Sequence, residues 1–147
     1  MTKLSEHFSL EEMCKTKVNL ENVPNETQVE NLKRLCGWLE MLRSEWNKRY
    51  GEGDDPIVIN SGYRSEAVNK AVGGVKGSNH LTGCAADIRV AGIEQLVRYA
   101  TILLDISDES QEDFVELLLE RSPRGGYWLH FAVRPSGNRR KVRLIQT

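Results

Sequence analysis

Long apolar runs, paired cysteines and an excess of charge of one sign are all absent from this sequence. The longest apolar runs, such as 102–104 and 117–119, span three residues, whereas a helix that crosses a bilayer needs about 20. Lysine and arginine together number 20 against 21 aspartates and glutamates, which leaves a net charge of -1. Such a balance provides no general field to attract nucleic acid or anionic lipid. We therefore expect neither a nucleic acid nor a membrane as a partner.

The cysteines and the N-terminus indicate where the chain is made. Cys14, Cys36 and Cys84 have no paired spacing, as suits a protein of a reducing compartment. The first seven residues lack the apolar core of a signal peptide. These features predict synthesis in the cytoplasm without a signal peptide.

The length of 147 residues, with 39% hydrophobic and 28% charged residues, favours one compact domain, 1–147, which we expect to be a monomer. Residues 1–25 form a mixed polar leader, expected to pack on the rest. Asn25 and Gln28 have the form of a capping box ahead of a helix at 27–50. Periodicity and turn residues predict helices from Ser65 to Val72 and at 93–104, and strands at 57–60, 84–90, 128–133 and 141–145. The pattern at 113–120 fits a helix or a strand. The prediction is a single α+β domain.

Two of the three histidines stand in unusual settings, and the third, His7, lies in a polar segment typical of a surface. His80 precedes Asp87 by seven residues, and the glycine and alanines between them would let the backbone approach a bound ion. His130 lies within an apolar, aromatic strand, where it either faces solvent, fills the core or binds a ligand. Two imidazoles and one carboxylate are an established ligand set for catalytic zinc.

Several further motifs accompany these histidines: Ser61-Gly62-Tyr63-Arg64-Ser65, Asn69, Gly73-Gly74, the S-x-H-x-x-G-x-A-x-D segment at 78–87 and the W-x-H of 128–130. With them the sequence resembles the zinc D-alanyl-D-alanine peptidases, which include D,D-carboxypeptidases, dipeptidases and phage endolysins and share their fold with the Hedgehog signalling domain. The short single-domain phage or prophage forms are the most similar, with a leader like residues 7–13 and an Asn-x-Pro like Asn22-Val23-Pro24.

The resemblance implies a small antiparallel sheet with flanking helices and one Zn²⁺ per chain, held by His80, Asp87 and His130. It implies that Arg64 contacts the substrate or the developing oxyanion, and that Ser78 hydrogen-bonds the substrate or supports a ligand. Without the resemblance, Arg64 could be a surface ion-pair residue and Ser78 a simple turn residue. The implied substrate is a peptidoglycan stem peptide, which the protein would reach after lysis or by a holin-type route.

The general base is where this sequence departs from the family. Many members carry Asp or Glu three residues before the last histidine, but here that residue is Tyr127, and a phenol ionises only near pH 10. The subgroup resemblance suggests Glu120 instead, with Glu116 a weaker candidate and a surface carboxylate the alternative. If 113–120 is a strand that pairs Glu120 with Trp128, Glu120 and His130 share a face, because side chains alternate along a strand.

Two function classes therefore stand side by side. The first is a zinc peptidase that hydrolyses peptidoglycan peptides, as a D,D-carboxypeptidase or an endopeptidase. The second is a non-catalytic zinc module that binds the cell wall or belongs to a phage structure, which the tyrosine at 127 keeps open. The basic residues from Arg134 to Arg143 could attract phosphate polymers, but a solvated hairpin accounts for them better.

Overall fold

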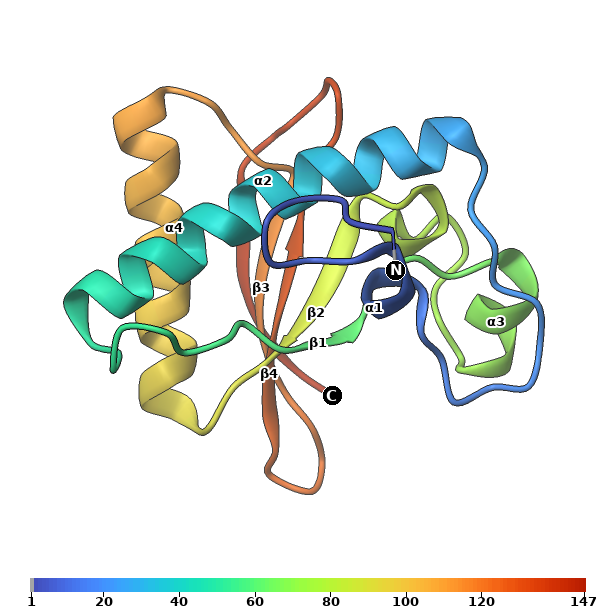
Figure 1. The fold of residues 1–147 in the computed structure, drawn as a ribbon. Coiled ribbons are helices and arrows are strands. Elements are labelled where there is room, and N and C mark those ends of the chain that lie inside the picture. The colour runs from blue at the N-terminus through green and yellow to red at the C-terminus, as the bar shows by residue number, and fades with distance from the viewer. Residues whose placement is uncertain (1) are drawn as a thin grey trace.

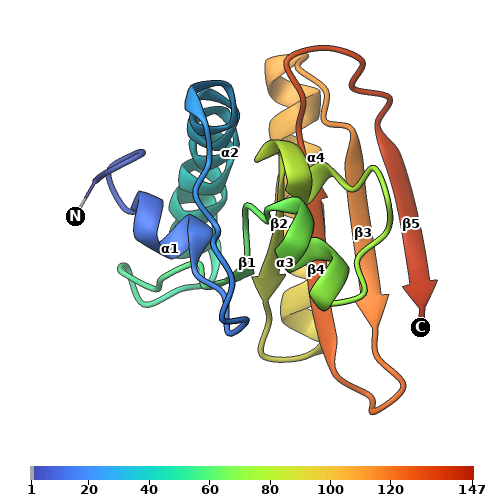
Figure 2. The ribbon, with the colours of Figure 1, turned by 90° about the vertical axis from the view of Figure 1, so that its right-hand side faces the viewer.

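The computed structural model describes residues 2–147, so that Met1 of the expected domain lies outside the described residues. The chain forms a single α+β domain around a five-stranded mixed sheet in the order β1-β2-β4-β3-β5. Its elements are α1 (Leu10–Cys14), α2 (Glu26–Arg49), β1 (Ile59–Ser61), α3 (Glu66–Ala71), the 3-10 helix η1 (Asn79–Thr82), β2 (Ala85–Arg89), α4 (Ile93–Ser110), β3 (Glu116–Arg121), β4 (Tyr127–Ala132) and β5 (Lys141–Gln146). In Figure 2, α4 lies behind the sheet and α3 in front of it. None of the helices between residues 2 and 147 is long and apolar enough to cross a membrane.

The last strand joins the sheet in a way that the sequence did not predict. The hairpin that the sequence indicates at 134–143 would pair the last two strands with each other, but β5 pairs with β3, in parallel. Both edges of β4 are already occupied, by β2 on one side and β3 on the other. The chain reverses after β4, and because β4 is antiparallel to β3, the returning strand runs parallel to β3 at its free edge.

Helix α2 crosses the molecule in Figure 1 and supplies much of the core. Its capping box is present as predicted, with the side chain of Asn25 accepting from the backbone of Gln28 and the side chain of Gln28 accepting from Asn25 N. Trp38 on its buried side packs against Phe131 of β4, with ring centroids 5.3 Å apart. Helix α4 runs six residues beyond the predicted end at 104 and stops where Gln111 adopts a positive φ of 60°.

The N-terminal leader packs on the domain and supports one loop in particular. Phe8 and Met13 are buried in the main core, and the backbone oxygen of Met13 accepts a hydrogen bond from Tyr63 N at 2.8 Å. Gly62 lies against the same carbonyl, where a Cβ atom would stand only 2.3 Å from the Met13 oxygen. Asn22 donates to the Tyr63 carbonyl and accepts from Ser65 N. The leader thus positions the loop that carries Arg64.

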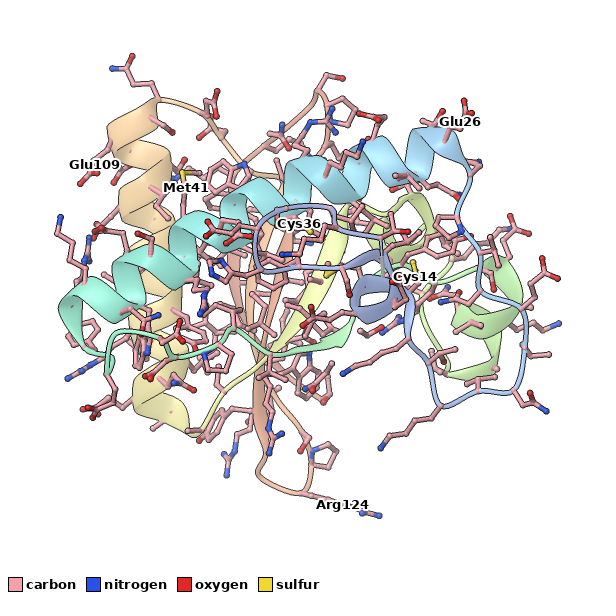
Figure 3. All side chains as sticks on the ribbon, in the orientation of Figure 1. Cys14, Glu26, Cys36, Met41, Glu109 and Arg124 are labelled. Atoms are coloured by element: carbon pink, nitrogen blue, oxygen red, sulfur yellow. The ribbon has the colours of Figure 1, made fainter. Side chains whose placement is uncertain are left out.

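The thiols are free, as the cysteine spacing indicated. Cys14 ends α1, Cys36 lies within α2 and Cys84 precedes β2, and no pair among them forms a disulfide in residues 2–147. Figure 3 shows the first two at separate places on the molecule.

The two faces of the sheet have different characters. Leu117, Leu129 and Phe131 point into the hydrophobic core, and each of these residues is 0% exposed to solvent. The alternate residues of the same strands point the other way, and His130 on β4 is directly paired with Asp87 on β2. This second face carries the polar cluster.

Candidate metal centre

Three side chains from separate elements meet on the polar face of the sheet. His80 comes from η1, Asp87 from β2 and His130 from β4, and each offers a ligand atom within 4.8 Å of the others. Asp87 Oδ1 lies 3.1 Å from His130 Nδ1 and 3.4 Å from His80 Nε2. The structure therefore brings together the three residues that the sequence proposed as zinc ligands.

Helix α2 sets the position of the segment that carries His80. Gln28 and Asn31 donate side-chain hydrogen bonds to the carbonyls of Leu81 and Thr82. Gly83 ends η1 with a φ of +77°, and a Cβ atom there would stand 2.6 Å from the Gln28 backbone oxygen. The glycine expected to allow close approach to an ion therefore serves a close approach to α2.

Hydrogen bonds orient both imidazole rings. His80 Nδ1 lies 2.7 Å from the carbonyl oxygen of Gly62, and because a carbonyl only accepts, this nitrogen carries the proton and leaves Nε2 free toward Asp87. His130 Nε2 lies 2.9 Å from Glu116 Oε1, while its Nδ1 faces Asp87. Metal-binding histidines typically have their second nitrogen held by a carbonyl or a carboxylate in this way.

The electrostatics of the cluster favour a cation. Burial opposes ionisation of Asp87, but its contacts with the rings of His130 and His80 hold the pKa of its carboxyl well below the usual range. Burial likewise opposes the charged form of His130, yet its hydrogen bonds to Asp87 and Glu116 raise its pKa to about 9. With two nitrogen donors and one carboxylate in reach of one point, the residues present fit a zinc ion.

Arg64 reaches the cluster through Asp87. Its Nη2 lies 3.2 Å from Asp87 Oδ2, its Nε donates to Ser61 Oγ at 3.0 Å and its Nη1 donates to Asn69 Oδ1 at 3.2 Å. All three guanidinium nitrogens therefore have protein partners, and Arg64 orients one ligand candidate from the side of β1.

Ser78 lies beside His80 and is nearly buried, with 9% of its surface exposed. Its hydroxyl oxygen accepts a hydrogen bond from His80 N at 3.1 Å and so caps η1. Ser78 is therefore a turn residue that also supports His80, one of the ligand candidates.

Two glutamates of β3 face the same cleft. The ambiguous segment is a strand here, and Glu120 lies opposite Trp128, which is the condition under which Glu120 shares a face with His130. Glu120 Oε2 accepts from Trp128 Nε1 at 3.1 Å, and burial, followed by the negative charge of Asp87, raises its pKa. Glu116 instead bonds His130, whose contact is the largest cause that lowers its pKa to about 2. Tyr127 lies on the opposite face and packs against the core.

Sequence reasoning missed the part played by Asn79. Its Nδ2 donates to Glu116 Oε1 at 2.7 Å, and its Oδ1 accepts from Arg134 Nε at 2.7 Å. The residue stands inside the 78–87 motif, but the motif gave no sign of partners on β3 and after β4. A cleft of about 480 Å³ surrounds the whole cluster, with Arg64, Ser78, His80, Glu116, Glu120 and Arg134 in its lining.

Comparison with known proteins assigns the chain to a family. One relative, the zinc D-Ala-D-Ala carboxypeptidase of Streptomyces albus G, is 48% identical over 40 residues, which are 27% of this chain and only 16% of that enzyme. The sequence profile of Peptidase M15 matches residues 6–107, more than half of the chain. His80 and Asp87 lie within this match, whereas His130 lies beyond it and is joined to them by the β2–β4 pairing. The chain belongs to the Peptidase M15 family.

Proposed function

We propose that this protein is a zinc-dependent peptidase that hydrolyses peptide bonds in peptidoglycan stem peptides. The observation that carries the proposal is the convergence of His80, Asp87 and His130 in a cleft that also holds Glu120. Family membership supports peptide hydrolysis, and the Streptomyces relative supports zinc and a D-Ala-D-Ala type of substrate.

The ligand atoms follow from the hydrogen bonds of the cluster. His80 Nε2, a carboxylate oxygen of Asp87 and His130 Nδ1 would hold the ion, because Gly62 and Glu116 occupy the other ring nitrogens. Zinc in such a site lowers the pKa of water and polarises a carbonyl group. Arg64 holds Asp87 in place and presents positive charge at the edge of the cleft, where an oxyanion would develop.

Glu120 is the better candidate for the general base. It faces the cleft without contacting a ligand candidate, and its pKa is raised, chiefly by burial. Glu116 is engaged by His130 and Asn79 and stays ionised at low pH. Since a base works best when its pKa approaches the working pH, Glu120 would accept the proton of the attacking water and return it to the leaving amine.

The test is digestion of purified muropeptides by the zinc-loaded protein, with the products identified by mass spectrometry. Glu120→Gln should retain zinc and fold but lower turnover by roughly 10²–10⁴-fold, because glutamine cannot accept the proton. Glu109→Gln, at the exposed end of α4 (Figure 3), is the matched control and should behave as the wild type.

Two results would contradict the proposal in different ways. If Glu120→Gln cleaves at the wild-type rate, another group is the base. If the wild type holds zinc but leaves every muropeptide intact, the protein is better described as a non-catalytic zinc module. One observation favours this alternative: Tyr127 lies on the face of β4 opposite to His130 and so offers no base to the cleft.

A further inference from the structure

Arg134 is a second arginine in the cleft, and the backbone around it is firmly held. It follows β4 directly, and its N–H donates to Asn138 Oδ1 at 2.8 Å while Asn138 Nδ2 donates back to the Arg134 carbonyl at 2.8 Å. This reciprocal pair closes the turn after β4. The side chain is half-buried and lines the same cleft as His80 and Glu120.

The guanidinium of Arg134 is anchored at one nitrogen only. Nε donates to Asn79 Oδ1 at 2.7 Å, and within residues 2–147 neither Nη1 nor Nη2 has a hydrogen-bond or ion-pair partner. Arg64, by contrast, has a partner for each of its three nitrogens. Arg134 therefore carries a pair of unused cationic donors on a side chain that lines the cleft and is held at Nε.

The carboxylates of the cleft are not available to fill this pair. Asp87 is bound by Arg64 and His130, Glu116 by Asn79 and His130, and Glu120 by Trp128. A guanidinium fork matches a carboxylate with two parallel hydrogen bonds. A carboxylate brought by the substrate would satisfy both donors.

The link from Arg134 to the metal centre is short. Arg134 bonds Asn79, Asn79 bonds Glu116, and Glu116 bonds His130, at 2.7, 2.7 and 2.9 Å. Arg64 contacts the centre through Asp87 of β2, whereas the series of hydrogen bonds from Arg134 reaches it through Glu116 of β3. A carboxylate on Arg134 thus lies within the reach of a short peptide whose scissile bond is at the metal centre.

We propose that Arg134 is a specificity-determining residue that binds a carboxylate of the substrate peptide, an inference that rests on the proposed peptidase function. The carboxylate can be the C-terminal group of the stem peptide or an acidic side chain within it. Peptides amidated at either group distinguish these two sources.

The experiment measures binding as well as turnover. The zinc-loaded Glu120→Gln protein, which should bind without cleaving, is titrated calorimetrically with a stem peptide in its free, C-terminally amidated and side-chain-amidated forms. Adding Arg134→Gln should weaken binding of the free peptide by about 10- to 100-fold, the usual range for a charge-assisted pair. For the peptide whose relevant carboxylate is amidated, Arg134→Gln should change the affinity very little. Arg134→Lys should restore only part of the affinity for the free peptide.

Arg124→Gln is the matched control, because it removes the same charge at the tip of the β3–β4 connection (Figure 3), and Arg124 is not among the residues that line the cleft. It should leave all three affinities unchanged. If Arg134→Gln lowers the affinity for the acid and the amide peptides equally, Arg134 only supports Asn79 and the subsite is overturned. The subsite is equally overturned if no affinity is lost, or if the free peptide does not bind the parent protein. Binding that depends on Arg134 without hydrolysis by the wild type would overturn the peptidase alone.

Discussion

At the scale of single residues, His130 is the side chain on which the contacts of the cleft converge. Asp87 faces one of its ring nitrogens and Glu116 the other, and the ring of His80 lies edge to face at a centroid distance of 5.2 Å. Glu116 is thus placed to hold the ring while Nδ1 points to the centre. Its role differs from that of Glu120 four residues later, although both glutamates face the same way.

Removing the charge of Glu116 should weaken the metal centre. Glu116→Gln keeps the size of the side chain and an oxygen for Asn79 but no longer gives His130 an anionic partner. We expect zinc affinity to fall by about 10- to 100-fold, as when carboxylate partners of metal-binding histidines are replaced. Competition with a chromophoric zinc chelator measures this, and Glu109→Gln supplies the baseline. Unchanged affinity would show that Glu116 does not support the ligand.

At the scale of elements, the leader and α2 together hold the loops of the centre. Helix α1 is fixed to the 61–65 loop by the hydrogen bond from Tyr63 N to the Met13 carbonyl. The start of α2 is fixed to η1 through Gln28 and Asn31. Elements far from the candidate metal ligands in sequence therefore set the orientation of Arg64 and His80.

Substitution of Gly62 tests the contact between α1 and this loop. In Gly62→Ala the new Cβ would meet the Met13 carbonyl, so that the backbone must shift; we expect a loss of about 1–3 kcal/mol in the free energy of unfolding. Zinc affinity should fall too, because the Gly62 carbonyl orients His80. Gly37→Ala, in α2 with open space around it, should be neutral or stabilising. Urea denaturation of both variants provides the comparison, and equal stabilities would refute the predicted clash.

The contact between the leader and α2 should give a pH dependence. Partial burial acts to raise the pKa of Glu40, but hydrogen bonds from Ser5 and His7 outweigh it and lower the pKa below 4.5. A lowered carboxyl pKa stabilises the fold above the pKa of the unfolded chain, and this contribution disappears as the pH falls through the folded-state pKa.

Glu40→Gln should therefore be less stable than the wild type near neutral pH, by about 1 kcal/mol. The difference should shrink as the pH falls from about 4 through the lowered pKa of Glu40 in the folded state, because the wild type then also loses the charge. Urea denaturation over a pH series measures it, with Glu109→Gln as the exposed control. A difference that stays constant with pH would rule out the charge of Glu40 as its origin.

At the scale of the whole molecule, the candidate metal ligands come from both halves of the chain. His80 and Asp87 belong to the segment before α4, and His130 belongs to the strand that follows it. An ion bound by all three is held only in the native fold, because the unfolded chain does not keep these ligands together.

Zinc should consequently stabilise the protein against heat. At a free concentration of about 100 times Kd, a ligand of the native state contributes about 2.7 kcal/mol, which raises the Tm of a domain of this size by about 5–10 °C. Differential scanning calorimetry with zinc and with chelator measures the shift. His80→Ala and His130→Ala should remove most of it, and a wild-type shift in both variants would refute the assigned ligands.

Local sequence determined the features that depend on residues close together in the chain. The capping box of Asn25 and Gln28 and the cap of Ser65 on α3 are present as predicted. Alternation along a strand puts Glu120 and His130 on one face once Glu120 lies opposite Trp128, as it does, but the sequence left 113–120 open between helix and strand. The 78–87 segment likewise indicated the first two ligand candidates. These features are local because caps and strand alternation act over a few residues.

Only the tertiary structure decided how the distant parts meet. Strand β5 pairs with β3 because both edges of β4 are occupied, which no pattern within β5 records. Glu116 and Glu120 lie on the same face of β3, and the sequence does not tell which of them contacts His130. In the structure Glu116 bonds His130, whereas Glu120 bonds Trp128. The free donors of Arg134 result from which partners its neighbours already have. Such choices depend on competition among residues brought together only by folding.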